Sequence, residues 1–164
     1  MNSKELFVRD TTVIRKSDNL FTAEVSENWS IGNTANGGYS MTLAAKAMSE
    51  YLEHKDPLSI SAHYLDRVDF GTTELHVTHL SSSKSLSTAR VELIQDNKIK
   101  IIFIGTFTDF SFKNDMNIYE RDVPNFPEYN SCEVIPYKEG FNPKLDKNIE
   151  KAYAQDSLWW KKDM

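Results

Sequence analysis

Residues 29–39 read Trp-Ser-Ile-Gly-Asn-Thr-Ala-Asn-Gly-Gly-Tyr and run directly into an apolar helical segment. The adjacent glycines, Gly37 and Gly38, carry no Cβ and so let a ligand come close to the backbone. The first turn of a helix has unpaired N–H groups and the positive end of the helix dipole, which suit a carbonyl oxygen or an anion. The stretch therefore predicts a ligand-binding helix start, with close packing of helix and strand as the plain alternative.

The helix is expected to cover residues 38–53 and to be surrounded by other structure. Apolar side chains occupy most of its circumference, which is typical of a helix that is wrapped rather than laid on a surface. Pro57 follows soon after and should end the helix, because proline disfavours helical conformation in the preceding residue. The polar residues fall on one narrow stripe: Thr42, Lys46, Ser49, Glu50 and Glu53.

Five segments have the composition of β-strands, one before this helix and four after it. They are residues 20–25, 58–65, 73–80, 86–95 and 98–107. Asp96 and Asn97 both tolerate positive φ, so they predict a two-residue hairpin that pairs Gln95 with Lys98. That register would put Ala89, Val91, Leu93, Ile102 and Ile104 on one face, and Ile94, Ile99, Ile101 and Phe103 largely on the other. A sheet that is apolar on both faces needs two covers, so a second subunit or repeat should cover the face that the helix leaves open.

The bulk composition describes one domain with an appendage. The 164 residues carry a net charge of −5, which argues against a general nucleic-acid or anionic-membrane binder. The single Cys132 excludes an internal disulfide framework and a cysteine-based zinc site. The charged N-terminus does not resemble a signal peptide, and no apolar run is long enough to span a membrane, so a cytoplasmic protein is expected.

The character of the sequence changes near its C-terminal third. We expect a domain over residues 1–112 and a linker-like tail over residues 113–164, which holds four of the five prolines. Residues 144–155 have the pattern of a short amphipathic helix. The sequence ends shortly after two adjacent tryptophans, Trp159 and Trp160.

Several segments, taken in order, resemble the acyl-CoA thioesterase-like family of the double-hotdog type. They are residues 10–13, 21–25, 29–31 and 36–39, then 56–65 ahead of Gly71, and finally 85–91 and 93–96. The resemblance covers roughly residues 8–110. It implies an α+β hotdog fold, in which one long helix is wrapped by a five- or six-stranded antiparallel sheet, and hydrolysis of an acyl-CoA thioester. In this family a second hotdog repeat starts near a tryptophan after a proline-rich linker.

Thioester hydrolysis needs a polarised carbonyl and an oriented water, and the residues offer candidates for both. The N–H groups of Gly38 and Tyr39, beside Gly37, are the candidate carbonyl clamp. Asn36 is expected either to cap the helix or to donate to the substrate. Gln95, at the end of the hairpin, is expected either to hold the water or to be a plain exposed residue.

Most of the other candidate residues also have a possible role outside the chemistry. His63 is a possible general base or a partly exposed or interface histidine. By the resemblance, Ser59 stands about where an aspartate would be wanted. The remaining substrate-binding candidates are Trp29, Arg67 and Arg90. The two arginines lie near strand ends and would either bind CoA phosphates or be solvated surface charges.

No metal or organic cofactor is predicted. His76 and His79 fall on opposite faces of their strand, so they do not form a ligand pair. The expected partners are an acyl-CoA and either a second copy, as a homodimer, or another hotdog domain. Two rivals to an active thioesterase stay open: a catalytically silent acyl-CoA-binding module, and the N-terminal half of a split double-hotdog assembly.

Overall fold

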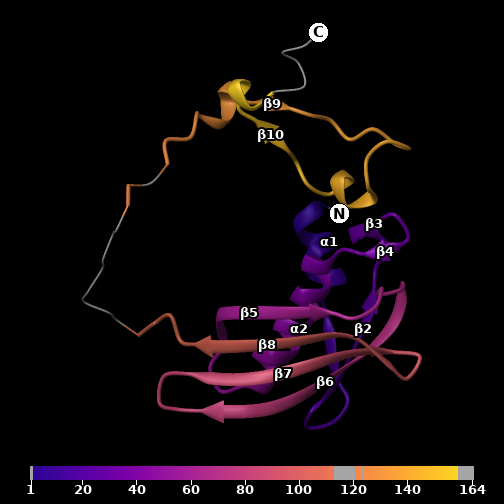
Figure 1. Ribbon diagram of the computed structural model, residues 1–164, viewed down its shortest axis with the longest axis vertical. Coiled ribbons are helices and arrows are strands. Elements are labelled where there is room, and N and C mark those ends of the chain that lie inside the picture. The colour runs from indigo at the N-terminus through magenta and orange to yellow at the C-terminus, as the bar shows by residue number, and fades with distance from the viewer. Residues whose placement is uncertain (1, 113–120, 123, 159–164) are drawn as a thin grey trace.

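The computed structural model describes residues 2–112, 121–122 and 124–158, and it forms an α+β hotdog fold (Figure 1). One six-stranded antiparallel sheet, in the order β1-β2-β6-β7-β8-β5, curves around the helix α2. The strands are β1 (Val13–Arg15), β2 (Leu20–Val25), β5 (Asp56–Tyr64), β6 (Gly71–Ser82), β7 (Ser87–Gln95) and β8 (Lys98–Thr108). The helices are α1 (Ser3–Asp10) and α2 (Gly37–Tyr51). All five strand segments predicted from the sequence are therefore present; α1 and β1 are additional.

The helix α2 is buried along most of its length, as its apolar circumference predicts. Leu43, Ala44, Ala47 and Met48 have no solvent exposure and pack among the inward side chains of the sheet. Asn36 caps the N-terminus, and the helix ends at Tyr51, before Pro57 enters β5. Burial of this apolar face, rather than helix propensity, holds the helix in place.

The β7–β8 hairpin has the predicted turn but not the predicted faces. Asp96 and Asn97 have φ of 50° and 58°, and Gln95 pairs with Lys98. One residue later the register shifts: Ile94 pairs with Ile99, whereas Leu93 pairs with Ile101, so Lys100 is an extra residue in β8. A one-residue shift exchanges the two faces of a strand. The prediction that Ile102 and Ile104 share a face with Ala89, Val91 and Leu93 is therefore wrong, because Ile101 and Phe103 lie on that face instead.

The tail packs partly against the domain (Figure 1). Its short elements are η2 (Tyr129–Ser131), β9 (Glu133–Val134), η3 (Lys144–Lys147), β10 (Ala152–Tyr153) and η4 (Gln155–Ser157). The helix predicted over residues 144–155 is wrong, because β10 pairs with β9 and leaves only one 3-10 turn. Leu145 packs on the core, and the Asn148 side chain donates to the Asn28 carbonyl at 3.0 Å. Trp159 and Trp160 lie outside the described residues.

Two short segments connect β2 to α2. The 3-10 turn η1 (Glu27–Trp29) is followed by a small hairpin of β3 (Ser30–Ile31) and β4 (Thr34–Ala35). Within the residues that the structure describes, no helix has the length and apolar character needed to cross a membrane.

Candidate functional site

A pocket of about 400 Å³ opens at the start of α2, and we call it the helix-start pocket. It is lined by Thr34, Ala35, Gly37, Tyr64, Leu65, Asp66, Arg67, Val68 and Ile101. These residues come from β4, from the first turn of α2, from the end of β5, from the loop that follows it and from β8. The structure thus brings together two of the predicted substrate-binding residues, Gly37 and Arg67.

Asn36 caps the helix, and the cap uses two of the N–H groups at the helix start that could otherwise bind a ligand. Its Oδ1 accepts from the Gly38 N–H at 2.9 Å and from the Tyr39 N–H at 3.2 Å. The two amides predicted as the carbonyl clamp are therefore engaged by the cap. Because Oδ1 is the accepting atom, the Nδ2 amino group of Asn36 takes no part in the cap. Within the described residues, neither this amino group nor the Gly37 N–H donates to a protein acceptor.

Tyr64 explains why the first helical residue is a glycine. A Cβ on Gly37 would lie 2.8 Å from the Tyr64 ring and hydroxyl oxygen, which is closer than real side-chain contacts allow. The Tyr64 phenol therefore lies directly against the backbone of the first turn, while 54% of this residue is exposed. The contact between Gly37 and Tyr64 packs the helix closely against β5, as the glycine pair suggested. The same contact forms one wall of the pocket.

The 65–70 loop, which carries Arg67, is held at several points. The Gln95 side chain pairs with the main chain of Asp69 in both directions, each at 2.9 Å. The Val68 carbonyl accepts from the Thr34 hydroxyl and from the Ala35 N–H. Gln95 is buried, so the expectation of a plain exposed residue is wrong. To hold a water, its amide would have to release one of its bonds to Asp69.

Lys100 supplies another attachment. Its Nζ donates to Asp66 Oδ2 at 2.9 Å, and its carbonyl accepts from the Leu65 and Asp66 N–H groups. The hydrogen bond from Lys100 holds the pKa of Asp66 below its ordinary value, and the same bond raises the pKa of Lys100. The sequence does not mark this lysine, because Lys98-Ile99-Lys100-Ile101 alternates like an ordinary strand with one exposed face.

The remaining candidates do not reach this pocket. Ser59 and His63 are exposed and lie on the face of β5 opposite to Tyr64. Arg90 lies on the outer face of β7 in an ion pair with Glu92. Trp29 is buried, and its ring packs against those of Phe7 and Tyr39.

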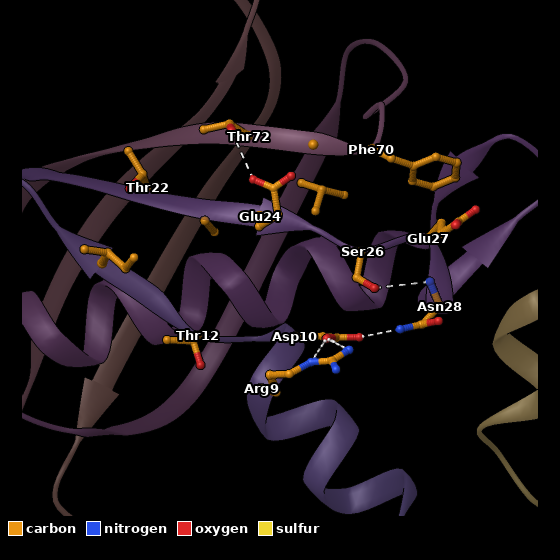
Figure 2. Close-up of a pocket in the computed structure, with 14 residues that line it drawn as sticks. Arg9, Asp10, Thr12, Thr22, Glu24, Ser26, Glu27, Asn28, Phe70 and Thr72 are labelled. Atoms are coloured by element: carbon orange, nitrogen blue, oxygen red, sulfur yellow. Dashed lines mark hydrogen bonds and ion pairs between the residues drawn. The ribbon is translucent and has the colours of Figure 1, made fainter. Parts of the chain in front are cut away.

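A second, wider hollow of about 970 Å³ lies beside α1 and β2, and we call it the acidic hollow (Figure 2). At its centre Asp10, with a side chain 5% exposed, accepts from Arg9, from the Asn28 amide and from the Trp29 indole N–H. Burial alone would raise the pKa of Asp10, but these hydrogen bonds outweigh it and hold the pKa below 3.8. Asp10 thus explains why Trp29 is a core residue. Residues 10–13 belong to the family-like pattern, but the pattern alone did not connect them with Trp29.

The polar groups of the acidic hollow are largely bound to one another. Glu24 accepts from the Thr72 hydroxyl at 3.0 Å, and Glu27 forms an ion pair with Lys144 of the tail. The lining holds three carboxylates and one cation, Arg9. This charge disfavours a phosphate-bearing ligand. The helix-start pocket is therefore the better candidate for a nucleotide-containing thioester.

Comparison with known proteins assigns the fold to a family. A family model described as the acyl-CoA thioesterase N-terminal domain matches residues 25–109, which include α2 and the sheet strands β5, β6, β7 and β8. The chain belongs to this family. No curated protein matches the sequence significantly.

Solved structures show the same fold within longer chains. A Thermobifida fusca protein provisionally named thioesterase II superposes with a TM-score of 0.83 at 20% identity, over 96% of this chain and 58% of its own. A hotdog-fold protein of Alicyclobacillus acidocaldarius gives a TM-score of 0.75 at 13% identity, over 85% and 52%. An acyl-CoA thioesterase II from Mycobacterium marinum gives 0.63 at 14%, over 79% and 52%. The chain thus spans little more than half the length of these proteins.

Proposed function

We propose that this protein binds an acyl-CoA at the helix-start pocket and takes part in hydrolysis of its thioester bond. The observation that carries the proposal is the pair of donors at the start of α2, the Gly37 N–H and the Asn36 amino group. Membership of the acyl-CoA thioesterase family supports the choice of ligand. The cytoplasm is the compartment we assign, and the free thiol at Cys132 supports this choice.

In this mechanism the thioester carbonyl oxygen accepts from both donors. Water attacks the carbonyl carbon, the developing oxyanion is stabilised by the same hydrogen bonds, and the C–S bond then breaks. The CoA thiolate takes up a proton, and a carboxylic acid is the other product. Arg67 binds a phosphate group of the CoA at the mouth of the pocket. Leu65 and Tyr64, both exposed, offer apolar contacts to the rest of the ligand.

The group that activates the water comes, in this proposal, from a second hotdog. Asp66 is the one carboxylate that lines the described pocket, and it is bound to Lys100. The edge strand β5 pairs only with β8 within the described sheet, and Tyr64 at its end borders the pocket. An unpaired edge is a template for another strand. Pairing of β5 with the equivalent strand of a second copy or a second hotdog domain would bring new side chains to the pocket.

Asn36 offers a sharp test of the carbonyl-binding role. Aspartate and serine cap helices as well as asparagine does, but Asn36→Asp and Asn36→Ser both remove the amino donor. We expect both variants to fold as the wild type does and to release free CoA about 100-fold more slowly, measured with a panel from acetyl-CoA to palmitoyl-CoA. Full activity in both variants would show that Asn36 donates nothing to the substrate. Binding of the panel without turnover by the wild type would instead favour a silent binding module.

The assembly is tested separately by sedimentation at micromolar protein concentration. We expect a dimer, and we expect Ser61→Lys, an exposed substitution in the middle of β5, to weaken it by bringing like charges together. The matched control is Thr22→Lys on β2, a half-exposed position with β1 on one side and β6 on the other. A monomeric wild type would contradict the homodimer and leave pairing with a separate hotdog domain.

A further inference from the structure

The extra residue in β8 places a lysine inside the protein. Lys100 is only 6% exposed, although it lies between residues that pair in register with β7 on either side. A buried ammonium group is costly unless it is paired. Asp66 Oδ2 is the side-chain atom that pairs with it, at 2.9 Å. An apolar residue at this position would be buried at a lower cost in free energy. The presence of the Lys100–Asp66 pair therefore needs an explanation.

Asp66 connects Lys100 to Arg67. While Oδ2 of Asp66 accepts from Lys100, its Oδ1 accepts from the Arg67 main-chain N–H at 2.8 Å. The Arg67 guanidinium, in contrast, forms no hydrogen bond or ion pair with any described residue, and Arg67 is exposed. The carboxylate nearest to it along the chain is therefore already neutralised by a buried cation. Among the residues lining the pocket, Arg67 is left as the one uncompensated charge.

We infer that Lys100 is a positioning residue for the anionic part of the ligand: by holding Asp66, it keeps Arg67 free to bind a phosphate group of the acyl-CoA. This inference rests on the proposed function. Without Lys100, Asp66 would be an unpaired carboxylate one residue from Arg67. It would compete with the phosphate for the guanidinium, while the main-chain bonds from Leu65 and Asp66 to the carbonyl of residue 100 still hold the loop to β8. Lys100 touches neither ligand nor pocket and acts through Asp66.

The test compares four variants with the wild-type chain, using the release of free CoA and the binding of CoA itself by calorimetry. Lys100→Met removes the charge and keeps the length of the side chain. We expect it to raise KM about ten-fold with kcat within about two-fold, because only ground-state binding is lost. The double variant Lys100→Met with Asp66→Asn removes both charges, and we expect its KM to return toward that of the wild type. Lys100→Arg should also stay near the wild type.

Lys98→Met is the matched control. Lys98 is exposed, lies two residues from Lys100 and exerts an electrostatic effect on Asp66, but it does not contact it. We expect its KM to change less than about two-fold, since exposed charges are screened by solvent. A KM for Lys100→Met equal to that of the wild type, or a double variant as weak as the single one, would overturn the inference while the proposed function stands. A wild type that neither binds CoA nor hydrolyses acyl-CoA would overturn the proposed function, and the inference with it.

If Lys100→Met alone fails to fold, the double variant still decides the matter. A folded double variant with a ten-fold weaker affinity for CoA would show that the lysine does more than neutralise Asp66, and the inference would be wrong. Thermal melting of each variant identifies this case.

Discussion

The acidic hollow and the helix-start pocket both border the segment that joins β2 to α2, and their polar groups are arranged in opposite ways. In the hollow, Asp10 accepts from three side chains, and Glu24 and Glu27 have partners of their own. At the helix start and in the pocket beside it, the Asn36 amino group, the Gly37 N–H and the Arg67 guanidinium are left without protein partners among the described residues. Polar groups that satisfy one another hold a fold together, whereas donors left open are available for a ligand. The larger of two cavities is therefore not the better candidate for a site.

The largest expected effect is on stability, and it comes from removing the central carboxylate of the acidic hollow. Asp10→Ala removes the acceptor of the Trp29 indole N–H and of the Asn28 amide in a buried place. We expect a loss of about 3 kcal/mol in the free energy of unfolding, measured by urea denaturation, because buried donors are left unsatisfied. Glu24→Ala, in the same hollow but exposed, is the control and should leave stability nearly unchanged. A small loss in Asp10→Ala would mean that the comparison between the two cavities fails.

A smaller effect is expected at the pocket, and on a different quantity. Arg67→Gln removes the unpartnered guanidinium, so we expect KM for acyl-CoA to rise about ten-fold while the urea midpoint stays unchanged. The substitution Arg90→Gln removes a charge from the outer face of β7 and serves as the control. If Arg67→Gln lowered stability and left KM unaltered, Arg67 would be a structural residue like those of the hollow.

The smallest effect is a dependence on pH. The pKa of Asp10 is lower in the folded protein than its ordinary value of 3.8, so the folded state favours the ionised carboxylate. Its contribution to stability is therefore complete above that value and is lost as the pH falls through the lower folded pKa. We expect the stability difference between the wild type and Asp10→Asn to shrink below about pH 4, measured by urea denaturation at several pH values. A difference that is constant with pH would show that Asp10 is not preferentially ionised by folding.

The fold could be read from the sequence because its signals are local. Alternation identified the strands, the apolar circumference identified α2, and Asp96-Asn97 identified the tight turn. The short helix α1 was missed, since its eight residues carry few apolar side chains. The tail helix was wrongly predicted because a periodic pattern over residues 144–155 says nothing of the pairing of β10 with β9.

The site was predicted only in part, because its remaining features depend on contacts between distant segments. Asn36 and Gly37 follow from the helix start, which is local. The roles of Gln95 and Lys100 depend on the 65–70 loop, which lies about thirty residues earlier in the chain. No pattern in the β8 sequence marks where an extra residue will be accommodated. The predicted face of Ile102 and Ile104 was therefore wrong, and the inward position of Lys100 was not predicted.

The extra residue in β8 also limits how the gene for this protein can change. Upstream and downstream of Lys100, the inward residues of β8 are out of phase by one position. Loss of a single codon at this point would restore plain alternation and remove the buried lysine from the 65–70 loop. Deletion of Ile102, just before Phe103, would instead turn Phe103 and Phe107 outward. Within the pairing of β7 with β8 the register shifts at one place, and that place carries the lysine that binds Asp66 beside the pocket.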